Sequence, residues 1–591
     1  MKGQEDNIKR KKMLARKPLI LFTIICTFII SGCASNVNVA KQLSAQTSVS
    51  PLEGVLVARV INTTGYRLPF NQLFIDPKEV NTSKEVKTVL AYAEGSPVGD
   101  SSLFAVSLTP GEYSLSAVRS IIFRGESYYT RSSFTDPEFG VFKVQAGKVT
   151  DLGTIVYYAK PADDVYNDIL VRLPDSAQGQ VLKDYFPDFA NNEEVLTWER
   201  DERDEQRFSA YASAAQNPTT FSGEVLAPDG SLYFLGKLGV VLRYSADDGF
   251  ETLAVDTDLQ VNAFAQNDAG DRIAGGFEGA LYFQKAGGDW ENIAIPEKAA
   301  IHHLGFYQEN QFDVVYSIDK FLHIARFNNE DLSTSKVLNT YDYAGRWEVA
   351  GVALEAREKP PRPHNIKTVW VSQQGEKKIL KVSSYRAGKW DAFNSTDTET
   401  YRFSPDTWEM NVVEEYDEMD TILTAGAIDL GIKQPGYWSW SGKPSYYSRI
   451  NEDGPWREIN AQILTCKEGQ TMQSNDVCND GSKAVKARSE SFSFKSRPWF
   501  WDNDNGLAIV NFSDVDFWSG QRKSETSILA TDDGGVTWEK TELALPKPYC
   551  ADIIGVVTDR ILLTCSGATS DFYESSDRGE TWQHVRQQQD F

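Results

Sequence analysis

The 591-residue chain has few basic residues for its size, and it lacks two common ligand-binding motifs. Lysine and arginine number 60 against 83 aspartates and glutamates, so the formal net charge is −23 at pH 7. Binding to phosphates needs a basic stripe, so this charge disfavours a nucleic-acid partner. The sequence contains no C-x-x-C-H haem site and no phosphate loop of the form G-x-x-x-x-G-K-[ST]. No cofactor is therefore predicted.

A long apolar run is missing near the N-terminus. The apolar residues 19–30 are too few for a membrane-spanning helix, which needs roughly 20 residues. They follow a basic cluster at residues 9–17, and this order is typical of a secretory signal segment. Residues 1–32 are therefore predicted to be a signal peptide.

The end of this segment, Ile30-Ser31-Gly32-Cys33, resembles a bacterial lipobox. The resemblance implies cleavage before Cys33 and lipidation of its thiol and amine, with acyl chains such as palmitate. Ala34 is similar to the residue found after the cysteine in lipoproteins of the Gram-negative outer membrane, with the periplasmic and surface faces both open. Residues 33–51 would then form a lipidated, flexible tether. A plain signal peptide or a signal anchor is the alternative.

Cysteine is scarce, with six residues in the chain. If Cys26 leaves with the signal and Cys33 carries the lipid, four cysteines remain in two closely spaced pairs, and in an oxidising compartment such pairs suggest disulfides. The two pairs are Cys466–Cys478 and Cys550–Cys565. Zinc is the competing interpretation, but neither pair has C-x-x-C spacing or a nearby histidine. No metal site is therefore predicted.

Residues 52–159 alternate in polarity like a series of short strands, and the Pro110-Gly111 turn predicts a hairpin among them. This region resembles the prealbumin-like or Ig-like β-sandwiches of bacterial lipoproteins, which implies a spacer or interaction module. The character changes at residues 160–220, where opposite charges fall three or four residues apart between Trp198 and Arg207. Such spacing predicts a partly helical linker.

Two stretches near the C-terminus share the pattern S/T-x-D-x-G-x-T-W. Its residues are Thr531, Asp533, Gly535, Thr537 and Trp538, and then Ser575, Asp577, Gly579, Thr581 and Trp582. A carboxylate that accepts backbone amides, and a glycine that can take positive φ, suit a tight turn between strands. The pattern resembles the Asp-box (BNR) repeat of sialidases, sortilin-type receptors and photosystem-assembly propellers. This resemblance implies a β-propeller in which these residues stabilise turns.

Weaker copies of the same unit recur from residue 221 onward. After a first copy at 221–253, glycine turns precede a tryptophan at Trp290, Trp347, Trp390 and Trp456. With the two full motifs this makes seven turns. The sequence therefore predicts an all-β chain, in which a small β-sandwich precedes a seven-bladed β-propeller over residues 221–591, with six or eight blades possible. Long insertions are expected at 401–432 and 460–497, where binding usually resides.

The sharpest enzymatic hypothesis is a sialidase-like or other glycan-active enzyme, because sialidases combine Asp-boxes with an early Arg-Ile/Leu-Pro and an arginine triad. That tripeptide occurs at Arg67 and at Arg172, both before the first recognisable blade. A glycosidase would also need two carboxylates at a defined separation. The neighbouring His302 and His303 would point to opposite faces of a strand, which argues against a shared metal ion. No catalytic residue is predicted.

Aromatic runs near residues 437–447 and 499–501 are rich enough to line a carbohydrate or peptide platform, although alternation lets half of each run pack in the core. The candidate binding residues are Trp440, Tyr447 and Trp501. The sequence thus predicts a non-catalytic binding or assembly scaffold, anchored at the outer membrane, whose propeller binds a protein or glycan partner. A glycan-active extracytoplasmic enzyme is the alternative.

Overall fold

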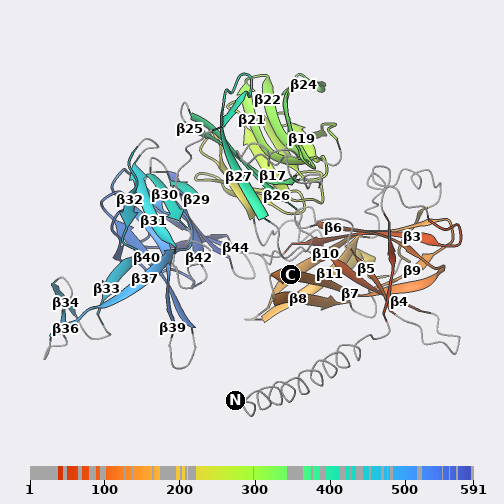
Figure 1. Cartoon of the computed structure of the whole chain (residues 1–591), viewed down its shortest axis with the longest axis horizontal. Helices are drawn as coiled ribbons and strands as arrows, with labels where there is room; N and C mark the ends of the chain where they lie inside the picture. The colour runs from red at the N-terminus through yellow and green to blue at the C-terminus, as the bar shows by residue number, and fades with distance from the viewer. Residues whose placement is uncertain are drawn as a thin grey trace, which may run out of the picture.

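The computed structural model consists almost entirely of β-strands (Figure 1). It describes residues 37–586 apart from these segments: 44–48, 64–69, 79–87, 93–100, 125–126, 136–138, 163–164, 174–194, 200–201, 207–208, 210–220, 297–298, 343–363, 375–376, 387–394, 413–418, 420, 426–427, 434–443, 451–453, 467–470, 475–476, 480–483, 516–521, 549, 558–559 and 567–569. Cys33, Arg67 and Trp440 lie outside the described residues. Within the described ranges, no helix is long and apolar enough to cross a membrane.

Two sheets pack face to face in the N-terminal part of the chain. One has the strand order β1-β5-β4-β7-β8 with β9 also on β7, and the other has the order β11-β10-β3-β6-β2 with β12 also on β10. The strands are β1 (Val37–Val39), β2 (Lys41–Gln42), β3 (Gly54–Asn62), β4 (Gln72–Pro77), β5 (Thr88–Tyr92), β6 (Ser101–Leu108), β7 (Gly111–Arg124), β8 (Ser127–Phe134), β9 (Val141–Val144), β10 (Val149–Ala162), β11 (Val165–Leu173) and β12 (Val195–Leu196). Alternate residues of both sheets, such as Leu56 and Ala58 on β3 and Leu73 and Ile75 on β4, share one buried core. This packing makes the unit a β-sandwich.

The sandwich includes strands on both sides of residues 52–159. Strands β1 and β2 precede this range, and β11 follows it within the segment expected to be a linker. Strand β11 pairs antiparallel with β10 along its whole length, from Thr154↔Leu173 to Ala162↔Val165. Both partners satisfy their backbone hydrogen bonds in this ladder, so the chain continues the sheet instead of leaving it.

Trp198 fastens the end of the expected linker to the sandwich. Its side chain is only 2% exposed, and its indole N–H donates a hydrogen bond of 2.7 Å to the Leu152 carbonyl oxygen. The ring meets Phe139 and Phe142 edge to face. Of the described residues that follow, 204–206 and 209 are helical. The charge pattern therefore corresponds to a short helical turn beside a buried tryptophan.

Seven antiparallel sheets follow one another along the chain from Phe221 to Arg586, and we number them blades 1 to 7. The strands of blades 1 to 4 are β13 (Phe221–Leu226), β14 (Leu232–Gly236), β15 (Val240–Ser245), β16 (Gly249–Ala254); β17 (Val261–Gln266), β18 (Arg272–Gly276), β19 (Leu281–Gln284), β20 (Trp290–Asn292); β21 (Ala300–Gln308), β22 (Gln311–Ile318), β23 (Phe321–Asn328), β24 (Asp331–Asp342); β25 (His364–Gln374), β26 (Lys377–Arg386), β27 (Ser395–Phe403) and β28 (Met410–Val412). Each of these sheets uses four consecutive strands, which we call A to D in chain order.

Blades 5 and 7 have the same plan, while blade 6 is enlarged. Blade 5 consists of β29 (Thr421–Ala425), β30 (Ile428–Lys433), β31 (Ser445–Ile450) and β32 (Arg457–Ile459). Blade 6 consists of β33 (Gln462–Thr465), β37 (Arg488–Phe494), β38 (Trp499–Phe500), β39 (Gly506–Val515), β40 (Arg522–Thr531) and β41 (Glu539–Lys540). Blade 7 consists of β42 (Cys550–Val557), β43 (Arg560–Ser566), β44 (Ser570–Ser575) and β45 (Gln583–Arg586). In blade 6, strand A is divided into β37 and β38, which both pair with β39, and strands B, C and D are β39, β40 and β41. An extra small sheet of β34 (Thr471–Ser474), β35 (Val477–Asn479) and β36 (Ala484–Lys486) lies between β33 and β37. We call residues 462–491 the arm; it projects at the lower left of Figure 1.

One of the two expected insertions is a real excursion from the blades, and the other is not. Residues 460–497 contain the arm. Residues 401–432 instead supply the end of β27, all of β28 and β29 and most of β30, which are regular strands of blades 4 and 5. The acidic residues from Glu414 to Asp420 fall between β28 and β29 at positions outside the described residues.

Apolar cores join most neighbouring blades and join the last blade to the first; within the described residues, blades 4 and 5 share no such cluster. Separate buried clusters contain residues of blades 1 and 2, 2 and 3, 3 and 4, 5 and 6, and 6 and 7. A further cluster joins blade 1 to blade 7, where the Phe234 and Phe572 rings lie 5.1 Å apart. Beside it the Tyr244 hydroxyl donates a hydrogen bond of 2.7 Å to Glu574. The last blade therefore packs on the first, and the seven sheets form a β-propeller.

The strand order separates the loops onto two ends of the ring. Because successive strands are antiparallel, the B–C loops and the D–A connections lie at one end, which we call the connector face, and the A–B and C–D turns lie at the other, the turn face. Hydrogen bonds follow this division. At the connector face, Gly279 in a B–C loop donates to the carbonyl oxygen of Ala299 in a D–A connection. At the turn face, Gly534 in a C–D turn donates to Asp504 in an A–B turn.

The sandwich contacts the connector face of blades 1 and 2. The Arg59 guanidinium on β3 makes a two-point ion pair with Glu278 in the B–C loop of blade 2, at 2.9 and 2.5 Å, and both side chains are nearly buried. In blade 1, Lys237 donates a hydrogen bond of 3.0 Å to the Asn62 carbonyl oxygen, and Leu238 packs among apolar residues of β3 and β10. Polar and apolar contacts together hold the two units in one arrangement.

Candidate functional site

The first full Asp-box forms the C–D turn of blade 6, between β40 and β41. The Thr531 hydroxyl accepts a hydrogen bond from the Gly535 amide at 3.0 Å, and Asp533 accepts one from the Thr537 amide at 2.9 Å. Gly535 has φ of 82°, a left-handed conformation that favours glycine. The Trp538 indole donates to the Gly535 carbonyl oxygen at 2.9 Å while its ring is buried in the core between blades 5 and 6.

The second Asp-box forms the C–D turn of blade 7, and its serine and aspartate accept the corresponding hydrogen bonds. Ser575 accepts from the Gly579 amide at 2.7 Å, and Asp577 accepts from the Thr581 hydroxyl and amide at 2.5 and 2.8 Å. These hydrogen bonds, the Thr581 hydroxyl first, lower the pKa of Asp577 from 3.8 to about 2. The Trp582 ring packs partly into the core between blades 6 and 7. In both boxes the aspartate accepts hydrogen bonds from its own turn, so it acts as a structural group.

The C–D turns of blades 3 and 4 differ from the turns expected from sequence. In blade 3 the turn falls at residues 329–330 between β23 and β24, well before Trp347. In blade 4 the C–D turn lies between β27 and β28 and contains Trp408. Trp390 instead falls between strands B and C of that blade, before β27. The Trp408 indole donates to Asp313 of blade 3 at 2.7 Å, and its ring stacks on Phe403 at 4.1 Å. Trp347 and Trp390 themselves lie outside the described residues.

The structure contains both predicted disulfides, Cys466–Cys478 and Cys550–Cys565. The first joins Cys466, directly after β33, to Cys478 in β35. It therefore links the base of the arm covalently to the small sheet of β34, β35 and β36. The second joins β42 to β43 in blade 7, where the two cysteines are direct partners in the ladder.

The three candidate aromatic residues do not form one platform. Trp440 lies outside the described residues. Tyr447 is partly buried near the start of strand C in blade 5, toward the connector face, where it pairs with Gly431 and Glu458. Trp501 follows strand A of blade 6 at the turn face, and the Arg578 guanidinium lies 5.0 Å over its ring. Tyr447 and Trp501 therefore belong to opposite ends of the propeller.

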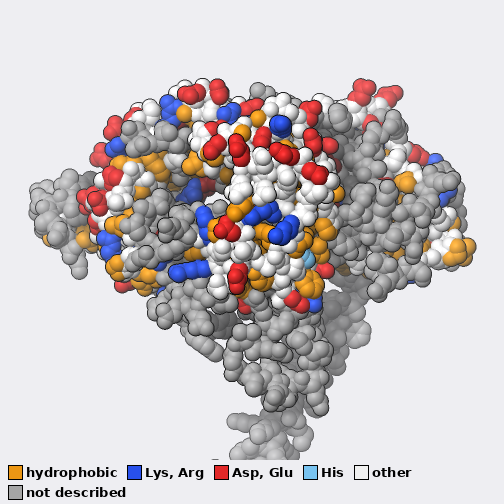
Figure 2. Space-filling model, turned by 90° about the horizontal axis from the view of Figure 1, so that it is seen from above, with side chains coloured by type: hydrophobic (Ala, Val, Ile, Leu, Met, Phe, Trp, Pro, Cys, Tyr) orange, Lys and Arg blue, Asp and Glu red, His pale blue; other side chains and the backbone are white. Residues whose placement is uncertain are grey.

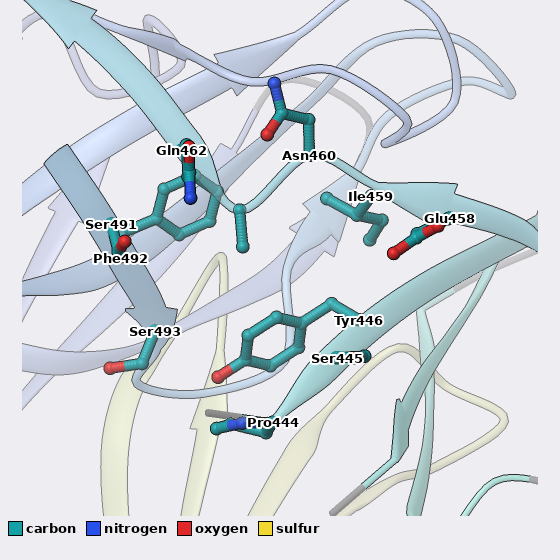
Figure 3. A pocket seen from close by; sticks show the side chains of 11 residues that line it. Pro444, Ser445, Tyr446, Glu458, Ile459, Asn460, Gln462, Ser491, Phe492 and Ser493 are labelled. Atoms are coloured by element: carbon teal, nitrogen blue, oxygen red, sulfur yellow. The ribbon is translucent and has the colours of Figure 1, made fainter. Parts of the chain in front are cut away.

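A pocket of about 600 Å³ opens between blades 5 and 6 at the connector face (Figure 3). Its residues come from the start of β31, from the segment that runs from β32 into β33, and from β37: Pro444, Ser445, Tyr446, Glu458, Ile459, Asn460, Ala461, Gln462, Ser491, Phe492 and Ser493. We call this the 5–6 pocket. Its volume falls within the range of roughly 300–1,000 Å³ that is usual for small-ligand sites.

The base of the 5–6 pocket is apolar and belongs to the core between the two blades. Tyr446, Ile459 and Phe492 are buried members of that core. In Figure 3 the Tyr446 ring lies across the hollow from Asn460 and Gln462, and the Phe492 ring lies beside Gln462. Burial raises the pKa of the Tyr446 hydroxyl, so this group stays protonated at neutral pH and can donate a hydrogen bond.

Exposed polar side chains form the rim of the 5–6 pocket. Glu458, Asn460 and Gln462 alternate along one extended segment, and all three are exposed. Gln462 also accepts a hydrogen bond of 2.9 Å from the Ser489 hydroxyl, which steadies its amide. Among the described residues that line the pocket, there is one carboxylate and neither lysine nor arginine. Acidic side chains are frequent on the upper part of the face that Figure 2 shows. The pocket thus suits a neutral ligand rich in hydrogen-bonding groups.

Other titratable groups are engaged in the blades. A register shift in β21 separates Ile301 from His303, and His302 lies at this shift with its Nε2 2.7 Å from the Ser317 hydroxyl. Burial lowers the pKa of both His302 and His303 to about 4, so both rings are neutral at pH 7. Within the described residues, no group of three or more His, Cys, Asp or Glu side chains is placed to hold a metal ion.

The described copy of the sialidase-type tripeptide belongs to the sandwich. Arg172 lies in β11, fully buried, with its guanidinium 3.0 Å from the Asp204 carboxylate and 4.7 Å over the Trp198 ring. An arginine that binds the carboxylate of a substrate must reach a pocket of the propeller. Arg172 instead stabilises the end of the sandwich.

No family model and no curated protein matches this sequence. Solved structures do match it. YCF48 from Cyanidioschyzon merolae is 11% identical, with a TM-score of 0.34 and coverage of 59% of this chain and 93% of that chain. The GH74 xyloglucanase from Xanthomonas campestris is 13% identical, with a TM-score of 0.28 and coverage of 63% and 67%. BamB from Moraxella catarrhalis is 11% identical, with a TM-score of 0.27 and coverage of 59% and 83%. Likeness at this level carries no argument about function.

Proposed function

We propose that this protein is a non-catalytic binding scaffold, held at the outer membrane of a Gram-negative bacterium by lipid on Cys33, whose propeller binds a protein or glycan partner. The observation that carries the proposal is the 5–6 pocket on the connector face. That same face carries the sandwich at blades 1 and 2 and the arm at blade 6. Rigid sheets that position variable loops at one end are a common arrangement for binding sites.

The chemistry of the pocket favours binding over hydrolysis. Retaining and inverting glycosidases use a pair of carboxyl groups that flank the scissile bond. In the part of the chain that the structure describes, Glu458 is the one carboxylate that lines the 5–6 pocket. A single carboxylate can accept hydrogen bonds from a ligand, but it cannot serve as both general acid and nucleophile or base. The glycan-active enzyme therefore remains the second hypothesis.

Cross-linking in the intact membrane tests the scaffold function. A photoreactive residue in place of Asn460, which is exposed at the pocket rim, should capture a defined partner, whereas one in place of Asp532, which is exposed at the turn face, should not. Mass spectrometry would identify the captured molecule. Equal capture from both positions, or none from either, would show that the connector face is not the binding surface.

A further inference from the structure

We infer that the 5–6 pocket binds a short, neutral saccharide. This inference rests on the scaffold function proposed above and names the ligand of the same site. It follows from the types of side chain at the pocket and from its charge.

The side chains of the pocket match both surfaces of a sugar ring. A neutral sugar presents hydroxyl groups at its edge and C–H groups on its faces. The rings of Tyr446 and Phe492 line the pocket and are 4% and 5% exposed, so they offer a small apolar surface to such a face. The amides of Asn460 and Gln462 supply both donors and acceptors for hydroxyl groups, and the serine hydroxyls do the same.

A peptide that adds as a β-strand is the competing occupant, because strand addition needs an open edge of backbone N–H and C=O groups. At the pocket wall, β32 pairs with β31 through Tyr446↔Ile459 and β33 pairs with β37 through Gln462↔Ser491, and each strand lies at the edge of its sheet. Between these ladders, the Phe492 amide donates to the Ala461 carbonyl oxygen at 3.1 Å. The side chains that line the pocket favour the saccharide, and capture of a protein in the cross-linking experiment would favour the peptide.

Charge selects a neutral saccharide over an acidic one. Sialic and uronic acids carry a carboxylate, which proteins commonly hold with arginine or lysine. The described lining residues include neither, and Glu458 would repel an anion. The net charge of −23 extends this repulsion to the surroundings.

A glycan array read with the full chain in detergent tests the inference. The array would carry neutral chito-, malto- and manno-oligosaccharides beside sialylated and uronic-acid glycans, and we expect retention on neutral glycans alone. Calorimetry with the retained oligosaccharide would then compare variants. The double variant Asn460→Ala/Gln462→Ala should bind about 10- to 100-fold more weakly, because it removes two side-chain amides that hydrogen-bond to the ligand.

Two further variants separate loss of binding from loss of fold. Tyr446→Phe keeps the buried ring, removes one hydroxyl, and should weaken binding about 3- to 10-fold. The control variant Gln308→Ala/Gln583→Ala removes two exposed amides from blades 3 and 7 and should bind like the unaltered protein.

Three results would overturn the saccharide inference: no retention on any glycan, retention on acidic glycans alone, or binding that survives the Asn460→Ala/Gln462→Ala change. The cross-linking result distinguishes this outcome from failure of the scaffold function. If the Asn460 position captures a protein while the array stays empty, the scaffold function stands and the saccharide inference is wrong. If both experiments are empty, both proposals are wrong.

Discussion

The ion pair between Arg59 and Glu278 should be the strongest single contact that orients the sandwich on the propeller. Their side chains are 3% and 11% exposed, and two nitrogen–oxygen contacts of 2.5 and 2.9 Å join them. Removing one partner from such a pair leaves a buried charge without its counter-charge, which typically costs about 3–5 kcal/mol. Glu278→Gln should therefore loosen the interface by an amount of this order.

A double-mutant cycle isolates the contribution of the pair. Arg59 also donates a hydrogen bond of 2.7 Å to Ser101, so the Arg59→Met change alone removes more than the ion pair. The variants Arg59→Met, Glu278→Gln and the combination should give a coupling energy of about 2–5 kcal/mol. The measurement is hydrogen exchange of amides in the B–C loops at residues 237–239 and 277–280, which the sandwich covers.

A small coupling energy would contradict this reasoning. Exposed ion pairs contribute about 0–1 kcal/mol, so a value below about 1 kcal/mol would mean that water reaches the Arg59–Glu278 contact. Fast exchange of residues 237–239 in the unaltered protein would lead to the same conclusion, because the sandwich would then not protect blade 1.

Three other predictions concern the anchor, the Asp-box and the sandwich. Cys33→Ala should abolish incorporation of an alkyne-tagged palmitate that the unaltered protein takes up in cells, and labelling that persists would place the lipid elsewhere. The depressed pKa of Asp577 means that its carboxylate stabilises the fold above pH of about 4, and that this advantage over Asp577→Asn is lost as the pH falls through about 2; an advantage that is constant across acid titration would contradict the turn hydrogen bonds. Trp198→Ala should destabilise the sandwich by about 3–5 kcal/mol in hydrogen exchange, and Trp198→Phe by less, since the indole is buried among aromatic rings.

Features whose hydrogen bonds stay within a few residues could be predicted from the sequence. The bonds of an Asp-box join Thr531 to Gly535 and Asp533 to Thr537, so eight residues specify the turn. Strand alternation and turn spacing, together with the resemblances to lipoprotein sandwiches and Asp-box propellers, predict the sandwich and the propeller, and cysteine pairing predicts both disulfides. These patterns are either local or repeated along the chain, and each repeated copy strengthens the prediction made from the others.

Features that depend on distant partners could not be predicted. Trp408 has φ of 52° in its turn and is stabilised by Asp313 of another blade, so no glycine before it marks the turn. The sequence predicts a linker where β11 lies, because the residues of β11 do not by themselves indicate a strand. Its pairing with β10 makes it part of the sheet. The predicted number of turns equals the number of sheets, although Trp347 and Trp390 do not mark the C–D turns of blades 3 and 4.

The 5–6 pocket was missed for a similar reason. Three segments that are separate in sequence line it, and sequence reasoning favoured the densest aromatic runs instead. One signal was available. Glu458, Asn460 and Gln462 alternate with Ile459 and Ala461, which indicates an extended segment with one polar edge and one apolar edge.

The seam between blades 7 and 1 has a consequence for how the molecule is made. Each of these two blades is built from its own four consecutive strands, so they exchange no strand and meet through contacts such as the Phe234–Phe572 ring pair and the Tyr244–Glu574 hydrogen bond. The chain is synthesised from its N-terminus, so the apolar flank of blade 1 stays uncovered until β45 of blade 7 has been synthesised or exported. A nascent or partly exported chain would therefore be most prone to aggregation, and most in need of a chaperone, along this flank.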